Sequence, residues 1–402
     1  MPATRARFAF ELGLDICAFL FLPILVLASR GAAPLGGVAG ACAFGLAASN
    51  GATAWRRVRG WAAVFFALIV WGLASSLWAV DPQHSLLIAL RLTGLFLAGL
   101  SLMTAAEEIA APCRMTACLV AGLVVALALT VVQVLTHGVL TGMLSRRAFI
   151  APALNHAEDG FGFLLLPLGA ALFLTARRWL AVVLVLVAAA VIFLLVGDAA
   201  QLAFLLGVAA TALLYFWRQW LTRVAAAATV VVILAAPVIF PPLAGIDAAR
   251  HAAQEIKSSM WHRLAIWSFV GSRIAEKPLF GWGLDSSRAI PGGNTPIPDG
   301  YPGQTSLPLH PHNAPLQAWL ELGLPGAVIF ALIAARLWLA LGRASWPPLY
   351  AAAAGGSLVT ALTVALGSYG VWQEWLIASE FLTIFLIFVM ARVAPAPSQR
   401  TP

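Results

Sequence analysis

The fold class follows from long apolar runs, of which residues 179–196 are a clear case, reading WLAVVLVLVAAAVIFLLV. The run contains no polar or charged side chain, and Arg177 and Arg178 stand directly before it. A helix of this composition has no face suited to water, whereas about 20 apolar residues cross the hydrocarbon core of a bilayer. Its backbone groups are satisfied inside the helix, as a bilayer requires. This stretch therefore predicts a transmembrane helix.

The composition of the whole chain agrees with this stretch. Hydrophobic residues make up 61% of the 402 residues and charged residues 10%, against about 25% charged in ordinary soluble domains. So few charges cannot cover a water-facing surface, and the chain is predicted to be an all-α polytopic membrane protein. Its net charge of +8 comes almost wholly from arginine, which suits loops beside anionic membrane lipids rather than nucleic acid.

Working outward from that run, about twelve apolar segments qualify as transmembrane helices. Several are shorter than about 20 residues, so tilt or extension into the flanks must accommodate them. The candidates are residues 12–29, 35–49, 61–80, 86–103, 115–135, 161–176, 179–196, 201–216, 224–240, 324–341, 348–366 and 376–390.

The basic residues predict an orientation for these spans. With the N-terminus inside the cell, 14 of the 24 Lys and Arg residues fall in cytoplasmic loops and tails, and 4 in short outer loops. Cytoplasmic loops of membrane proteins carry such an excess. Both termini are therefore predicted to be cytoplasmic, in a bacterial inner membrane. Arg5 and Arg7 precede the first apolar segment without a small-residue cleavage site, so we expect a span there rather than a removed signal peptide.

One long stretch interrupts the spans and divides the chain into three parts. Residues 1–240 would hold the first nine helices, residues 241–313 a large periplasmic loop, and residues 314–402 the last three helices. Up to Ala275, apolar residues recur at helical spacing, so the first half of the loop is predicted to be helical. Its second half is rich in proline and glycine, which is typical of a mobile flap. Long irregular loops are usually functional.

Histidines gather on the predicted outer side of the membrane. His312 is the strongest candidate, because it stands in the sequence His-Pro-His-Asn directly before a span. An imidazole held at the mouth of a bundle can be partly desolvated and neutral near pH 7, as a general base for a sugar hydroxyl must be. The alternatives are a histidine that caps the helix, or the general polarity of outer loops. All seven lie outside or at the membrane edge, namely His84, His137, His156, His251, His262, His310 and His312.

Charged residues on the same side suggest an anionic ligand. Arg263 would hang over the bundle mouth, and a planar guanidinium binds phosphate oxygens through two parallel bonds. Arg146 and Arg147 lie in a short outer loop against the positive-inside bias, and Arg91 is a weaker case of the same kind. The alternatives are a solvated helix arginine and snorkelling to lipid headgroups. Glu321, about two helical turns beyond His312, would either orient a donor or snorkel.

The cysteines do not suggest a metal or a disulfide. Cys17, Cys42, Cys113 and Cys118 form no C-x-x-C pair, and three of them lie in or beside apolar runs. Buried membrane thiols are the expected reading. We therefore expect neither a metal site nor a bound cofactor.

Two motifs of the predicted loop resemble a known family, the bacterial O-antigen ligase and O-antigen polymerase superfamily. The first is His312-Asn313-x9-Gly323-x-x-Gly326, which resembles the outer-loop signature of the ligases. The second is Arg263-x-x-x-Trp267, followed by Pro-Leu-Phe-Gly-Trp-Gly at residues 278–283. The motifs span residues 263 to 326, and the predicted topology resembles the family over the whole chain.

The resemblance implies a glycosyltransferase of lipopolysaccharide biosynthesis. A glycan carried on undecaprenyl diphosphate would pass to an acceptor hydroxyl at the periplasmic face, with inversion and without nucleotide sugar or metal. For a ligase, the more favoured reading, the acceptor is lipid A–core; for a polymerase it is another lipid-linked repeat. On that template His312 is the base and Arg263 the diphosphate clamp. Arg147, Arg146 and Arg91 would assist, and the supporting residues are Asn313, Trp267, Glu321, Gly323 and Gly326.

The chain departs from this family at one point. Members commonly carry a Ser-Arg pair after the seventh span, where this chain has Gly-Asp-Ala-Ala-Gln at residues 197–201. Arg146, Arg147 or Arg91 would then have to substitute in space, or the donor is handled differently. A glycolipid transporter is the alternative of another class, because Asp198 and Glu380 fall within or beside predicted spans. The absence of an obvious internal repeat and the long outer loop favour the enzyme over a transporter or an inactive scaffold.

Overall fold

The computed structural model describes residues 2–48, 52–145, 151–175, 177–256, 258–297 and 303–394. These ranges form helices and turns, and their β-structure is a single isolated bridge between Pro296 and Thr305. Within them, 9 helical stretches are long and apolar enough to cross a membrane, and the first covers two helices at once. The prediction of an all-α polytopic membrane protein is confirmed. The number of twelve spans, the orientation and the three-part division stay predictions.

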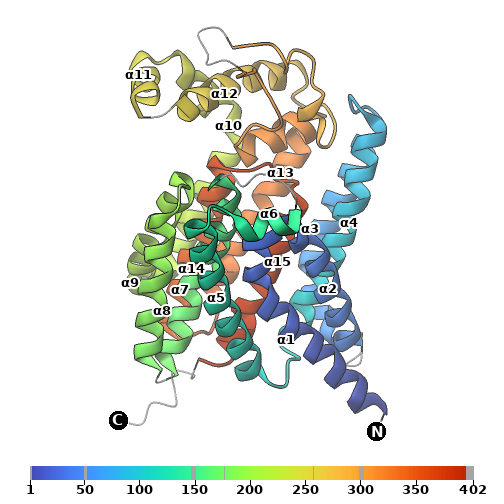
Figure 1. Ribbon diagram of the computed structural model, residues 1–402. Coiled ribbons are helices and arrows are strands. Elements are labelled where there is room, and N and C mark those ends of the chain that lie inside the picture. Colours follow the sequence, from blue (N-terminus) through green and yellow to red (C-terminus); the bar gives the residue numbers. More distant parts are fainter. Residues whose placement is uncertain are drawn as a thin grey trace.

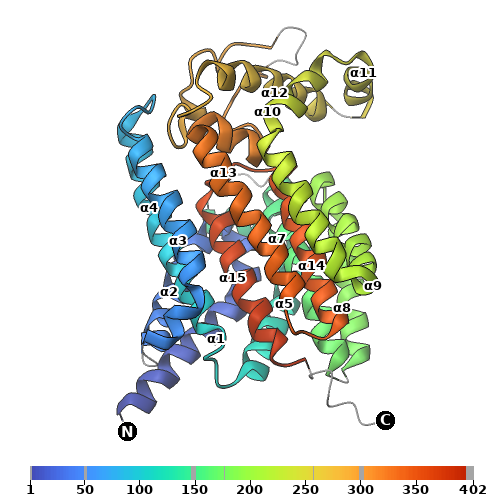
Figure 2. The same ribbon diagram turned by 180° about the vertical axis from the view of Figure 1, so that it is seen from behind.

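The helices pack side by side as a bundle, and a smaller group lies across one end (Figures 1 and 2). The first half contains α1 (Pro2–Ala28), η1 (Ser29–Gly31), α2 (Ala32–Ala48), α3 (Ala52–Ser75), α4 (Pro82–Ala105), α5 (Pro112–Leu135), α6 (Val139–Ser145), η2 (Ala151–Leu154) and α7 (Asn155–Leu174). The second half contains α8 (Arg178–Leu194), α9 (Asp198–Leu234), α10 (Ala236–Ile239), η3 (Pro241–Gly245), α11 (Asp247–Ile256), α12 (Ser258–Glu276), η4 (Ser286–Arg288), α13 (Ala314–Arg343), α14 (Pro348–Gly367) and α15 (Glu374–Ala391).

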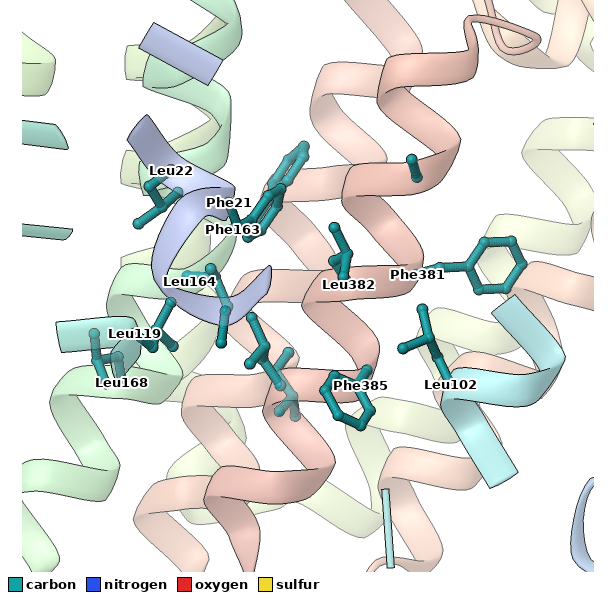
Figure 3. Packing of buried hydrophobic residues seen from close by; sticks show 14 of the residues in the cluster. Phe21, Leu22, Leu102, Leu119, Phe163, Leu164, Leu168, Phe381, Leu382 and Phe385 are labelled. Carbon is teal, nitrogen blue, oxygen red and sulfur yellow. The ribbon is translucent and has the colours of Figure 1, made fainter. Parts of the chain in front are cut away.

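The bundle is packed around a dry core where α1, α4, α5, α7 and α15 meet (Figure 3). Phe21, Leu102, Phe163 and Phe385 are each at most 1% exposed, and Leu119 is fully buried beside them. Because lipid is as apolar as these side chains, close packing holds membrane helices together rather than the exclusion of water. The core fixes α7 and α15, and both helices carry residues near the candidate site at one end.

Helix α9 bends at Trp217, whose backbone φ of −128° and ψ of 31° leave the helical region. Its first half follows α14, where the backbone of Gly207 lies so close to Gly356 that a side chain at either position would clash. Its second half packs along α13, with contacts that extend from Gly342 near the end of that helix to Ala331 near its middle. Because α13 and α14 are consecutive antiparallel helices, the two halves of α9 run in opposite directions. This agrees with the two spans predicted for the stretch.

Helix α13 is broken near its start at Gly323, which has φ of 63° and ψ of −159°. Pro325 has no backbone N–H, so a carbonyl of the preceding turn lacks its helical donor. The carbonyls of Leu320 and Glu321 accept instead from two backbone N–H groups of residues 278–283, at 2.9 and 2.8 Å. The Pro-Leu-Phe-Gly-Trp-Gly motif therefore pairs with the glycine motif. This pairing ties the loop to the start of α13.

The loop itself follows the prediction in its first half. Helices η3, α11 and α12 cover residues 241–245, 247–256 and 258–276, so the first half is helical over most of its length. The remainder consists of turns, η4 and the isolated bridge. Residues 298–302 of the predicted flap lie outside the described residues. Helices α11 and α12 lie across the end of the bundle where α13 begins (Figure 1).

Candidate active site

His312 lies in a tight turn between the loop and α13. Its backbone φ is 52°, a left-handed conformation that costs energy for a residue with a side chain and concentrates at functional sites. Two contacts hold the turn in place. The indole of Trp267 donates to the carbonyl of Pro311 at 3.0 Å, and Asn313 caps α13 by accepting from the N–H of Leu316 at 3.0 Å. Trp267 and Asn313 therefore position His312.

The imidazole of His312 is held in one tautomer. Its Nδ1 lies 2.5 Å from the carbonyl oxygen of Ser368, and a carbonyl can only accept, so Nδ1 carries the proton. The lone pair is then on Nε2, which has no hydrogen-bond partner among the described residues, and His312 as a residue is partly exposed. Burial lowers the pKa of His312 to about 4. The hydrogen bond to Ser368 acts in the opposite direction, and the electrostatic effects of Arg263 and His262 lower the pKa further. The imidazole is neutral at pH 7.

A second histidine packs beside it. The ring centroids of His310 and His312 are 4.2 Å apart, and the amide of Gln373 lies 3.3 Å from His310 Nε2. Burial lowers the pKa of His310 to about 3, and the neighbouring His312, Arg288 and Arg263 lower it further. Both imidazoles are therefore neutral, and the pair presents no positive charge of its own.

Arg263 supplies the positive charge near this pair. It lies on α12, and its guanidinium forms no hydrogen bond or ion pair within the described part of the chain. Burial lowers its pKa, and the carboxylate of Asp198 acts in the opposite direction. An arginine stays protonated at neutral pH in spite of such a shift. Because Arg263 lowers the pKa values of both histidines, it lies within electrostatic range of His312, at the same end of the bundle.

The departure from the family pattern falls at this same place. Asp198 begins α9, and its carboxylate lies within electrostatic range of Arg263. Gly197 before it lies against the buried carboxylate of Glu158, and a Cβ atom there would come within 2.2 Å of a Glu158 oxygen. The sequence identified the position as unusual. It did not reveal that an acidic residue would meet the candidate diphosphate clamp.

Glu321 has a place that neither sequence expectation foresaw. It is fully buried, so it neither snorkels to the interface nor extends toward a donor. Its carboxylate instead accepts hydrogen bonds from four donors of a buried network. They are the N–H of Asp285 at 2.6 Å, the hydroxyl of Ser287, the amide of Gln317 at 3.0 Å and the indole of Trp372. These contacts make Glu321 a structural anchor beneath the site, and the supporting role expected for it stays a prediction.

The remaining arginine candidates are not joined to the site by a described contact. Arg91 pairs with Glu374 at 3.2 Å and is 53% exposed, and it makes no described contact with His312 or Arg263. Arg146 and Arg147 lie outside the described residues. Gly323 and Gly326 act through the backbone, because a Cβ at either would come within 2.3 Å of Leu279 or Leu322.

One charged cluster near the site was not foreseen from the sequence. Asp285 has a backbone φ of 52° and accepts from His84 at 2.8 Å and from Arg288 at 3.1 Å. Arg288 is in turn close enough to His310 to lower its pKa. These residues come from α4 and η4, far apart in sequence, and no local pattern predicts their meeting. The cluster places a second arginine at the same end of the bundle as Arg263.

A mostly apolar cavity begins next to the site. It has a volume of about 420 Å³ and lies between α13, α14 and α15. One end of the cavity is lined by Ala314, Tyr369 and Val371, which lie close in sequence to residues that contact or adjoin His312. The other end reaches Trp346. Glu380 is among the few polar residues that line it. In the described ranges, no group of three or more His, Cys, Asp and Glu side chains could hold a metal ion.

Comparison with known proteins converges on one family. Residues 183–331, which include Arg263 and His312, match the O-antigen ligase family. The chain is 25% identical to a candidate polysaccharide ligase of Rickettsia felis over 336 residues, 80% of this chain and 78% of the relative. A counterpart in Rickettsia prowazekii is 25% identical over 337 residues, again 80% and 78%. One in Rickettsia conorii is 34% identical over 133 residues, 33% and 32%. These likenesses support the O-antigen ligase family as the family of this chain, and with it a multi-pass membrane enzyme.

Proposed function

We propose that this protein transfers a glycan from undecaprenyl diphosphate to an acceptor hydroxyl at the periplasmic face of the bacterial inner membrane. The observation that carries the proposal is the pairing of two groups at one end of the bundle. His312 is a neutral imidazole whose Nε2 has no hydrogen-bond partner among the described residues, and Arg263 is a partly buried guanidinium without a described partner. A proton acceptor beside an unpaired diphosphate binder is what such a transfer needs.

The residues divide the reaction between them. His312 Nε2 takes the proton from the acceptor hydroxyl as its oxygen attacks the anomeric carbon. The bond from that carbon to the diphosphate oxygen breaks, and the diphosphate leaves with the electron pair. Arg263 stabilises the charge that develops on the leaving group through paired N–H donors. A single displacement of this kind inverts the anomeric centre, and every step uses only groups of the chain and its two substrates.

The cavity beside the site fits the lipid part of the donor. Its upper wall lies next to the turn that holds His312, and it runs between α13, α14 and α15 along the length of the bundle. The lining is largely apolar, as a polyprenyl chain requires. A diphosphate bound at Arg263 would then place its first isoprene units in this cavity. Glu380 is the feature that the transporter alternative would use instead.

The proposed acceptor is lipid A–core, and the alternative is a second lipid-linked repeat. Purified protein supplied with undecaprenyl-diphosphate glycan should glycosylate lipid A–core and release undecaprenyl diphosphate. A product with the second repeat alone would identify a polymerase. A chain that joins neither acceptor, yet moves the labelled donor across proteoliposomes, would refute the transferase and favour the transporter.

A further inference from the structure

The turn after α14, residues 368–373, encloses the two histidines of the site. Ser368 accepts the Nδ1 proton of His312 at 2.5 Å. Gly370 lies against the ring of His310, so closely that a Cβ atom would come within 3.0 Å of it. Gln373 approaches the far side of the same ring at 3.3 Å. The tautomer of His312 therefore depends on where this turn is held.

Tyr369 anchors the turn to the bundle. Its ring stacks on His156 with centroids 5.3 Å apart and meets Trp375 edge-on at 4.9 Å. Its hydroxyl lies close to the carboxyl group of Asp159 on α7 and interacts with it. Burial and the neighbouring Asp159 raise the pKa of Tyr369 above its ordinary value, so the phenol remains a hydrogen-bond donor. The turn is thereby tied to a helix that the core holds in place.

Asp159 has little else to do in this position. Its side chain is 2% exposed, and its Oδ2 atom has no hydrogen-bond partner among the described residues. Burying a carboxyl group costs free energy that hydrogen bonds must offset. Among the described residues, the Tyr369 hydroxyl is the donor that interacts with this carboxyl group. A buried carboxyl whose described polar neighbour is one tyrosine hydroxyl suggests a role through that tyrosine.

We propose that Asp159 and Tyr369 are positioning residues for the glycan transfer, holding the Ser368 carbonyl against His312 so that the lone pair of the imidazole stays on Nε2. A neutral imidazole can carry its proton on either nitrogen, and the hydrogen bond made by one nitrogen decides which. Without the fixed carbonyl, part of the population would carry the proton on Nε2 and could not accept one from the acceptor. This inference rests on the proposed function.

Tyr369→Phe tests it, because the change keeps the stacked ring and removes only the hydroxyl. With lipid-linked donor and lipid A–core, we expect kcat to fall roughly ten-fold, short of the 10²–10⁴-fold contribution of a whole general base. Both KM values should stay within about two-fold, because the change keeps the ring that lines the cavity and removes only the hydroxyl. Tyr215→Phe on α9 is the matched control and should transfer glycan as the unchanged protein does.

The pH profile separates positioning from simple loosening of the structure. The hydrogen bond to Ser368 raises the pKa of His312, so its weakening should move the acid limb of kcat to lower pH. Loosening would admit water, relieve the burial that depresses this pKa, and move the same limb to higher pH. An upward shift with a lower kcat would therefore refute the proposal.

Asp159 supplies the second test. Asp159→Ala removes the acceptor of the tyrosine hydroxyl and should lower kcat about as much as Tyr369→Phe, roughly ten-fold. Asp159→Asn retains an oxygen acceptor and should recover most of the loss. The double variant with Tyr369→Phe should be no worse than either single change, because both break one link. Additive losses in the double variant would overturn the inference, and so would a Tyr369→Phe variant that transfers glycan as fast as the unsubstituted protein. If the unsubstituted protein transfers no glycan, the proposed function itself is refuted.

Discussion

Replacing Arg263 by lysine keeps a positive charge beside His312 and removes the planar fork. The guanidinium is partly buried and lacks a described hydrogen-bond or ion-pair partner, so little of its binding capacity is spent within the protein. Losing one preorganised donor to a developing oxyanion costs about 10²–10³-fold in kcat, or about 3–4 kcal/mol. We expect Arg263→Lys to fall in this range, because an ammonium cannot make the two parallel bonds.

The charge and the fork can be separated by the pH dependence. Arg263 lowers the pKa of His312, and His312 acts as a base only in its neutral form, so activity is lost as pH falls through that pKa. Lysine retains the charge, and the acid limb of kcat should stay where it is in the unchanged protein. Arg263→Gln removes the charge, raises the pKa of His312, and should move this limb to higher pH.

The assay follows the release of undecaprenyl diphosphate at saturating acceptor. Arg273→Lys is the matched control, because Arg273 lies on the same helix and is paired with Glu276 at 2.8 Å. It should leave kcat within about two-fold, since an exposed ion pair contributes little. If Arg263→Lys transfers glycan at a near-normal rate, the guanidinium does not bind the diphosphate, and Arg263 has a structural role.

Three further changes probe the base, the buried anchor and the cavity. His312→Ala should abolish transfer while the protein still inserts into the membrane, which immunodetection in membrane fractions checks; normal glycosylation of the acceptor would remove His312 from the base role. Glu321→Leu leaves four buried donors without an acceptor, so it should destabilise the fold by about 3 kcal/mol or more. A thermal midpoint in detergent equal to that of the unchanged protein would contradict the network. Ala361→Phe projects into the cavity and should raise KM for a donor with a full undecaprenyl chain but not for a short-chain analogue, whereas Val125→Phe on the outer face of α5 should change neither value.

The membrane fold was predictable because the bilayer imposes one simple requirement. A segment such as residues 179–196 must be helical and apolar throughout, so its composition alone indicates its structure. The helical half of the loop was predictable for a similar reason, since apolar spacing reports a buried helix face. The sharp bend at Trp217 could not be predicted, because no proline or glycine stands beside it in the sequence.

The site was predictable only where one short motif contains it. His312 and Arg263 are each marked by their neighbours in sequence, and the structure brings both to one end of the bundle. The surroundings of Glu321 could not be predicted, because its donors come from residues 34, 36 and 51 positions away along the chain, as well as from its own helix. Tyr369 and Asp159 gave no signal for the same reason. A hydrogen-bond network assembled by tertiary packing leaves no periodic trace in the sequence.

The charges around His312 suggest how the base and the donor depend on each other. Burial and Arg263 lower the pKa of His312 to about 4, and so weak a base takes a proton from a sugar hydroxyl poorly. A diphosphate bound at Arg263 would neutralise that guanidinium and add negative charge, and both changes favour the imidazolium. On the proposed mechanism, donor binding should therefore raise the pKa of His312 from this low value and strengthen it as a base. The proton then moves onto a group that lies beside the leaving diphosphate as its negative charge grows, so one electrostatic interaction serves both proton transfer and departure of the lipid carrier.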